Sequence, residues 1–240
     1  MKMKKLTIIL VLLMVLVSMS VSAQKRFGVP NLLKYDKQRF HFGFLIGFNQ
    51  FDFSITSKPN LSEYDSLMSI YTSPLTGFNL AIVTNMRLGD YFDLRFIPGL
   101  AFGDRVVNYS VKYYDGIEYP TKKNIESVYL DFPLLVKMKS SRMHNVRAYV
   151  IGGAQYSLDL ISNARKQESN PRETYLKIYP HDFQAQVGFG FDFYMTYFKF
   201  STEFKMSFGL DNLLKVEDNM YATSVTALRS RIVQISFLFE

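Results

Sequence analysis

Large apolar side chains alternate with other residues along the stretch that begins at Phe40. Phe40, Phe42, Phe44, Ile46 and Phe48 share one parity. Side chains of a β-strand point alternately to two faces, so this period of two predicts a strand. The alternation returns seven more times, and no Pro-, Gly- or Ser-rich linker divides the chain. We therefore expect one domain of eight strands, at about 40–55, 77–88, 92–103, 128–138, 146–158, 183–193, 198–208 and 231–239.

The connections between these strands are long and short by turns. The first, third, fifth and seventh are long and polar, at about 56–74, 104–126, 159–178 and 209–226, and Asp115-Gly116 in the second of these is expected to tip a hairpin. The others are short, at Gly89-Asp90, 139–145 and 194–196. Outer-membrane barrels place short turns in the periplasm and long loops outside. The pattern predicts an all-β fold: an eight-stranded antiparallel transmembrane β-barrel with an up-and-down meander and both mature termini in the periplasm.

The N-terminus has the pattern of an export signal. Lys2, Lys4 and Lys5 precede an apolar run, and Val21-Ser22-Ala23 forms a small-residue cleavage pattern. The apolar run is too short to favour the alternative, an uncleaved membrane anchor. We expect a signal peptide at 1–23, a periplasmic lead at 24–39 and the barrel at 40–240. The formal net charge of +7 falls to +4 without the signal lysines, and this mild excess does not call for a nucleic-acid partner.

Alternation alone also describes a soluble barrel of the lipocalin type, whose apolar row points inward. The second row distinguishes the two, because it is rich in glycine and charge, as the crowded interior of a membrane barrel requires. The inward charges are expected to neutralise one another, either as structural filler or as a proton or ion path. They are Arg87, Arg95, Lys137, Arg147, Lys199 and Lys205 with Asp93, Asp131, Asp192 and Glu203.

Three local features complete the prediction. The parity of the first strand changes near Asn49, after which Phe51, Phe53 and Ile55 carry the apolar side, so we expect a bulge or a membrane exit there. Pro98 cannot donate to a ladder and predicts a second bulge. An aromatic girdle is expected at the turn-side strand ends. Its members are Tyr91, Phe92, Tyr194, Tyr197, Phe198 and Phe239.

Candidate chemistry is sparse. The chain has no cysteine, which excludes disulfides, thiolate metal sites and a lipoprotein anchor, and its three histidines, His41, His144 and His181, lack metal-ligand spacing. His41 is interpreted as an inward polar filler. A hydrolase would need His181 and Asp182 to meet a serine such as Ser157 or Ser224. We expect no catalytic, cofactor-binding or metal-binding residues, no cofactor, no small-molecule substrate and no enzyme activity.

Three segments resemble the PorT (SprT) family of outer-membrane barrels from Bacteroidota. They are Asn31-Leu32-Leu33-Lys34-Tyr35-Asp36 with 40–44, Tyr129-Leu130-Asp131-Phe132-Pro133-Leu134-Leu135, and 199–201 through Phe208-Gly209-Leu210-Asp211-Asn212-Leu213-Leu214. The resemblance implies an accessory or assembly role in type IX protein secretion and gliding-related export. It implies outer-membrane lipid and other type IX secretion components as partners. The alternative is a small barrel for surface adhesion or envelope integrity, and an outer-membrane hydrolase or acyltransferase ranks third. Glu240 departs from the common pattern, in which an aromatic residue ends the last strand.

Overall fold

The computed structural model describes residues 29–57, 67–112, 118–161, 178–215 and 225–240. Two compact units divide the chain, Met1–Asn31 and Leu32–Glu240, and the second holds all the strands. The expected signal peptide, the start of the lead, Asp115-Gly116 and Ser224 lie outside the described residues. Among those that are described, no helix is both long and apolar enough to cross a bilayer.

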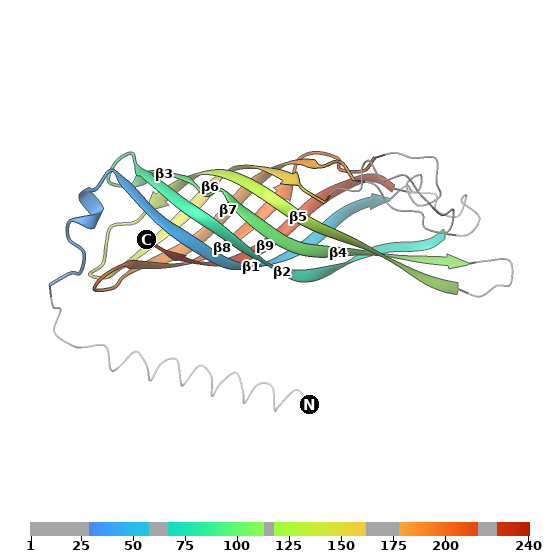
Figure 1. Cartoon of the computed structure of the whole chain (residues 1–240), viewed down its shortest axis with the longest axis horizontal. Coiled ribbons are helices and arrows are strands. Elements are labelled where there is room, and N and C mark those ends of the chain that lie inside the picture. The colour runs from blue at the N-terminus through green and yellow to red at the C-terminus, as the bar shows by residue number, and fades with distance from the viewer. Residues whose placement is uncertain (1–28, 58–66, 113–117, 162–177, 216–224) are drawn as a thin grey trace, which may run out of the picture. The chain divides into compact units, whose positions relative to one another are not determined.

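The second unit consists of one short 3-10 turn, η1 (Tyr35–Lys37), followed by antiparallel strands (Figure 1). The strands are β1 (Phe40–Ser57), β2 (Leu67–Arg87), β3 (Phe92–Phe96), β4 (Gly99–Lys112), β5 (Glu118–Lys139), β6 (Val146–Asp159), β7 (His181–Tyr194), β8 (Lys199–Gly209) and β9 (Val225–Phe239).

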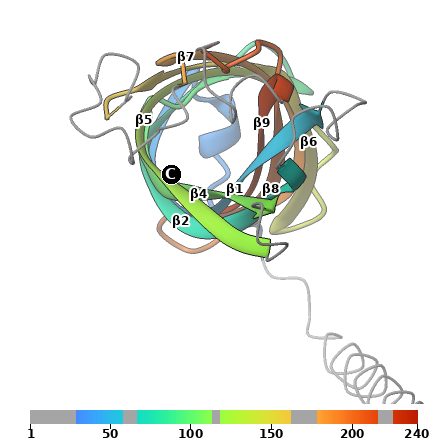
Figure 2. The same ribbon diagram turned by 90° about the vertical axis from the view of Figure 1, so that its right-hand side faces the viewer.

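The sheet closes on itself into a ring. β1 pairs with β2 from Phe40↔Met86 to Phe51↔Leu75, and with β9 from Phe44↔Phe239 onward. Each other strand pairs with its neighbours in chain order, and β3 and β4 both lie between β2 and β5. Viewed along the barrel, the strands enclose a single lumen (Figure 2). Since β3 and β4 occupy one place in the ring, the predicted eight-stranded meander is confirmed.

The break at Pro98 is not the bulge that the sequence predicted. Thr84↔Phe96 and Ala81↔Gly99 belong to one register, so no residue is inserted between β3 and β4. The Ile82 amide still donates to the Pro98 carbonyl at 2.9 Å. Pro98 has no N–H to return that bond to Ile82. On the other side, Ile97 donates to the Pro133 carbonyl oxygen, and Pro133 has no N–H to return that bond either. These two losses interrupt the strand between β3 and β4 without shifting the register.

Of the two explanations expected for the change of parity in β1, the bulge near Asn49 is wrong. Odd-numbered side chains point inward along the whole strand, from His41 through Leu45 to Phe51 and Phe53, which are 1% and 3% exposed. The pairing of β1 with β9 shifts register only between Thr56 and Ser57. The apolar residues changed side in the sequence because the lumen itself becomes apolar toward the loop end of the barrel.

The outer surface is apolar and the lumen is charged, as a membrane barrel requires and a lipocalin does not. Phe42 and Ile82 on the outside are 66% and 63% exposed, whereas Arg95 and Lys137 inside are fully buried. Buried and exposed side chains alternate along the described parts of the strands. The membrane-type interior is therefore confirmed.

Crowding explains the glycines of the inner row at two close approaches. A Cβ atom on Gly103 would meet the Phe51 ring, and one on Gly190 would meet the Tyr149 ring. Gly152 faces outward, and a Cβ there would meet only the Gln186 carbonyl oxygen, at 3.8 Å. Inward glycines thus make room for large inward side chains of neighbouring strands.

Several strands extend beyond their predicted ends. β2 begins at Leu67, within the stretch expected to be a loop, and β4 and β5 pair as far as Lys112↔Glu118. This long hairpin confirms the extended excursion expected between them (Figure 1).

The aromatic residues at the turn end divide between the two faces. Tyr91, Phe92, Tyr197 and Phe198 are exposed on the outside, and Phe239 is half-buried against Phe44, with 4.9 Å between ring centroids. Tyr194 is 2% exposed and points into the lumen, so its assignment to the girdle is wrong.

Candidate functional site

The end of the lumen nearest the short turns is closed by the lead. Leu32 precedes η1 with a φ of 52°, and η1 lies over the turn-end opening of the ring (Figures 1 and 2). The Tyr35 ring stacks on His41 with 4.0 Å between centroids, and His41 Nε2 bonds the Tyr35 carbonyl oxygen at 2.8 Å. His41 is 7% exposed, so its interpretation as an inward filler near this rim is confirmed.

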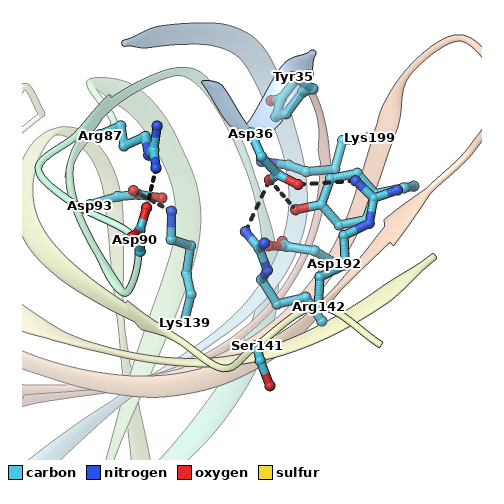
Figure 3. Close-up of polar contacts among 12 residues, drawn as sticks. Tyr35, Asp36, Arg87, Asp90, Asp93, Lys139, Ser141, Arg142, Asp192 and Lys199 are labelled. Carbon is cyan, nitrogen blue, oxygen red and sulfur yellow. Dashed lines mark hydrogen bonds and ion pairs between the residues drawn. The ribbon is translucent and has the colours of Figure 1, made fainter. Parts of the chain in front are cut away.

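Asp36 attaches the lead to three different parts of the barrel (Figure 3). Its carboxylate accepts hydrogen bonds from Arg142 Nη1 at 3.0 Å, Arg147 Nη1 at 3.1 Å and the Tyr194 hydroxyl at 3.0 Å. Partial burial alone would raise the pKa of Asp36, but Arg142, Arg147 and Tyr194 outweigh it, and the pKa is lowered. The lead is therefore held by an ionised carboxylate.

Glu240 points into the same opening from the end of β9. Its side chain accepts from Lys199 Nζ at 2.8 Å, Arg95 Nη2 at 3.3 Å and the Tyr35 hydroxyl at 3.2 Å. Burial opposes its ionisation, but the charges of Lys199 and Arg95 hold its pKa at about 2. Burial and the neighbouring Glu240 raise the pKa of Tyr35 well above its usual value, so the phenol stays a donor.

A belt of buried ion pairs lies next to this opening. Arg95 pairs with Glu203 at 2.9 Å, Lys137 with Asp192 at 2.7 Å and Lys139 with Asp93 at 2.6 Å. The Lys137 ammonium also lies 3.7 Å from the centroid of the Tyr149 ring. The two residues of each pair come from different strands, and the Arg95–Glu203 pair joins β3 to β8 across the lumen.

The predicted inward charges are buried, except Asp131 and Arg87, which are half-buried. Arg87 is the last residue of β2, and it binds Asp90 and the Gly89 carbonyl oxygen of the following turn (Figure 3). Arg105, Lys139 and Glu240 are inward residues that the prediction missed. Each continues the inward parity of its strand, after Gly103, Lys137 and Leu238 respectively, and that signal was available in the sequence.

The half of the lumen nearer the long loops is built around Arg105. Its guanidinium lies 4.3 to 5.1 Å from the ring centroids of Phe53, Phe51 and Tyr129, and Nη1 donates to the Tyr129 hydroxyl at 2.9 Å. Such aromatic faces attract a cation that is removed from water.

An apolar cluster covers Arg105 at the loop end. Its buried members are Phe53, Val107, Ile178, Leu213, Leu214, Val225 and Leu228. The Asn212 side chain accepts from the amides of Leu214 and Leu228 at 3.2 and 2.9 Å, which holds the segment after β8 against β9.

Two small voids lie between these layers. One, of about 20 Å³, is lined by Asp131, Lys205, Gln155, Gln234 and neighbours, and another, of about 10 Å³, lies beside Tyr35 and Asp192. A void of this size holds about one water molecule. The described side chains therefore fill the lumen rather than line a pore.

Of the described residues considered for a hydrolase, Ser157 and Asp182 lie opposite each other on β6 and β7, but His181 does not meet them. His181 is on the outer face, where Nδ1 bonds the Tyr156 hydroxyl at 2.6 Å, whereas Asp182 and Ser157 are buried inside. Ser157 donates to Asp131 at 2.7 Å. His144 lies in the β5–β6 turn with a φ of 59°. Among the described residues, no group of three or more His, Cys, Asp or Glu is arranged to hold a metal ion.

A comparison with family models agrees with this architecture. The model described as outer membrane protein beta-barrel domain matches residues 22–215. The chain belongs to the outer membrane protein beta-barrel domain family. Membership in this family indicates that the apolar outer face of the barrel lies in the outer membrane.

No curated protein matches this outer membrane protein beta-barrel. Among solved structures, the crystal structure of the outer membrane protein OprG from Pseudomonas aeruginosa is similar at 11% identity and a TM-score of 0.39, covering 90% of this chain and 96% of that one. The resemblance to the PorT family stays a prediction.

Proposed function

We propose that this barrel is an accessory or assembly component of type IX protein secretion, and that it works through protein contacts rather than by conduction. The filled lumen carries the proposal. Arg95, Lys137 and Arg105 are buried in the lumen, and each is engaged by a side chain from another strand. An eight-stranded barrel has room inside for side chains only, so folded cargo cannot pass.

The proposal assigns the work to surfaces outside the hydrocarbon layer. With short turns in the periplasm, as is usual for such barrels, the lead and η1 face the periplasm and the β4–β5 hairpin faces outward. Asp36 and Glu240 hold η1 in one place at the turn end. The barrel then acts as a membrane anchor that positions contact surfaces, and no catalytic step is assigned to it.

Two of the segments that resemble the PorT family have specific structural roles, which supports the finer proposal. Tyr35 and Asp36 of the first close the turn end, and Asn212 and Leu213 of the third help to close the loop end. The segments that resemble the family therefore lie at both closed ends of the barrel. This supports a contact surface at each end that members of the family have in common.

The test is deletion of the gene followed by measurement of cargo release. Loss of secreted cargo, restored by the wild-type gene, is expected. Normal secretion in the deletion strain would refute the role, and loss of attachment or envelope integrity with secretion intact would favour the alternative of adhesion or envelope support. Crosslinking in intact outer membranes, followed by identification of the captured proteins, would name the partners.

A further inference from the structure

A hollow of about 320 Å³ opens at the turn end of β1 and β2 and is lined by basic side chains. Its lining consists of Lys37, Arg39, Arg87, Leu88 and Gly89. The Arg87 amide donates to the Arg39 carbonyl oxygen at 2.8 Å, and this ladder bond brings the two arginines side by side although they are far apart in sequence. The hollow is distinct from the lumen and from the network around Asp36.

The charges of this hollow are not balanced by protein. Asp90 pairs with Arg87 and is itself largely exposed (Figure 3). Lys37 and Arg39 are exposed, and neither has a carboxylate partner among the described residues. An excess of two positive charges therefore faces the hollow, where an anion would be stabilised.

The hollow also lies where the apolar outer surface ends. The Arg39 guanidinium is 6.0 Å from the ring centroid of Phe40, the first outward aromatic residue of β1. Phe40 is 48% exposed, and Leu88 and Tyr91 are each 58% exposed. A cation that leans on a lipid-facing ring is at the depth of the headgroups, where basic pockets recognise lipid phosphates.

The space fits a headgroup. A volume of 320 Å³ corresponds to about ten water molecules at the density of the liquid. No atom lies within 4 Å of the position a Cβ on Gly89 would take, so the turn leaves the hollow open. Arginine can bind a phosphate through two parallel N–H donors, and lysine adds a point charge.

We propose that Lys37, Arg39 and Arg87 bind the phosphate of an anionic phospholipid in the leaflet at the turn end. In the orientation proposed above, this is the periplasmic leaflet, and the identification of the leaflet rests on that proposal. The lipid tails lie along Phe40 and Leu88, which distinguishes this ligand from a free phosphate ion. The site fixes the depth and rotation of the barrel at one side of the ring.

The test uses the full mature chain in detergent micelles, with phosphatidylglycerol or phosphatidylcholine added and retained lipid counted by native mass spectrometry. The wild type is expected to retain phosphatidylglycerol in preference. Lys37→Gln/Arg39→Gln is expected to weaken that retention by about 25-fold, at about fivefold for each charge near a membrane surface. These two residues precede β1, so the barrel should still fold, which its heat-modifiable mobility on SDS gels would verify.

The matched control is Arg229→Gln/Arg231→Gln, which removes two outward basic residues near the loop end of β9. It should keep the wild-type preference. No preference in the wild type, or an equal loss in the control, would overturn the proposal. Displacement of phosphatidylglycerol by equimolar inorganic phosphate would identify a free-anion site instead. Since binding in micelles depends on neither orientation nor secretion, its failure and that of the proposed function are separable.

Discussion

Individual carboxylates hold the turn end of the barrel closed. Asp36 and Glu240 lie near opposite ends of the sequence of the folded unit, yet they meet at the turn end of the barrel. Each accepts hydrogen bonds from two basic residues. Both have a lowered pKa, because the neighbouring cations outweigh the cost of burial. Their contribution to stability therefore depends on staying ionised.

The first prediction at this scale concerns Glu240→Gln. The change leaves Arg95 and Lys199 without one buried partner, and we expect a loss of about 3 kcal/mol in the free energy of unfolding. Urea titration of the barrel in lipid vesicles would measure it. Because the folded pKa is about 2, the contribution is present above the unfolded value of about 4.3 and is lost as the pH falls toward 2. The variant should accordingly lose that part of the acid dependence, and an unchanged acid profile would contradict the assignment.

The second prediction concerns the lead. Asp36→Asn removes the charge that Arg142 and Arg147 bind, and the amides of residues 35–38 should exchange hydrogen faster while those of the strands do not. In the wild type the same release should occur only as the pH falls below the usual carboxyl value of about 3.9, because the pKa of Asp36 is lowered on folding. Hydrogen exchange read by mass spectrometry checks both. Protection that survives Asp36→Asn would mean that Tyr35 and His41 alone hold the lead.

The third prediction concerns crowding. Gly103→Ala places a Cβ against the Phe51 ring, and overpacking of this kind costs about 1 to 3 kcal/mol. Gly152→Ala, on the outer face, should be nearly neutral. Equilibrium unfolding of both, and of Gly103→Ala/Phe51→Leu, would provide the measurement. If the smaller side chain at position 51 does not restore stability, the clash is not the cause.

At the scale of the element, β3 and β4 show how prolines interrupt a strand without moving it. The register with β2 is the same on both sides of Pro98, but Pro98 cannot donate to the Ile82 carbonyl, and Pro133 of β5 cannot donate to the Ile97 carbonyl. Within a bilayer a missing backbone bond is costly, since no water replaces it.

The fourth prediction follows from this geometry. Pro98→Val supplies the absent N–H at a position already in register, and it should stabilise the barrel by about 1 kcal/mol. The midpoint of urea unfolding in vesicles should rise. A lower midpoint would indicate that the backbone at this position requires the proline, as a true bulge would.

At the scale of the whole molecule, the lumen is layered. The lead, the ion-pair belt, the Arg105 cage and the loop-end cluster of Leu213 and Leu214 follow one another. Each layer draws side chains from several strands, so that the ring is braced from within. This arrangement is suited to a rigid anchor.

The fifth prediction tests that conclusion. The barrel reconstituted in planar bilayers should give no stepwise ion conductance, and vesicles containing it should not swell in small sugars. A porin reconstituted in the same way is the positive control. Stable conductance steps would refute the filled lumen and would favour an ion path through the buried charges.

Much of the fold could be predicted from the local periodicity of the sequence. Alternation predicts strands β6 and β8, the short turns and the inward charges from Arg95 to Lys205. The reason is that a strand in lipid must face the hydrocarbon with one parity and the lumen with the other. The same rule would have placed Glu240 and Arg105 inward, since each continues the parity of its strand.

Alternation by itself determined which residues of a strand share a face. The prediction failed where apolar residues were assumed to face outward. Phe51 and Phe53 are apolar and yet lie in the lumen, around Arg105. Only the tertiary structure decided that placement, the return of the lead onto His41, and the separation of His181 from Ser157. The physical reason is that closure of the ring sets which distant strands stand opposite each other across the lumen, and no local pattern contains that information.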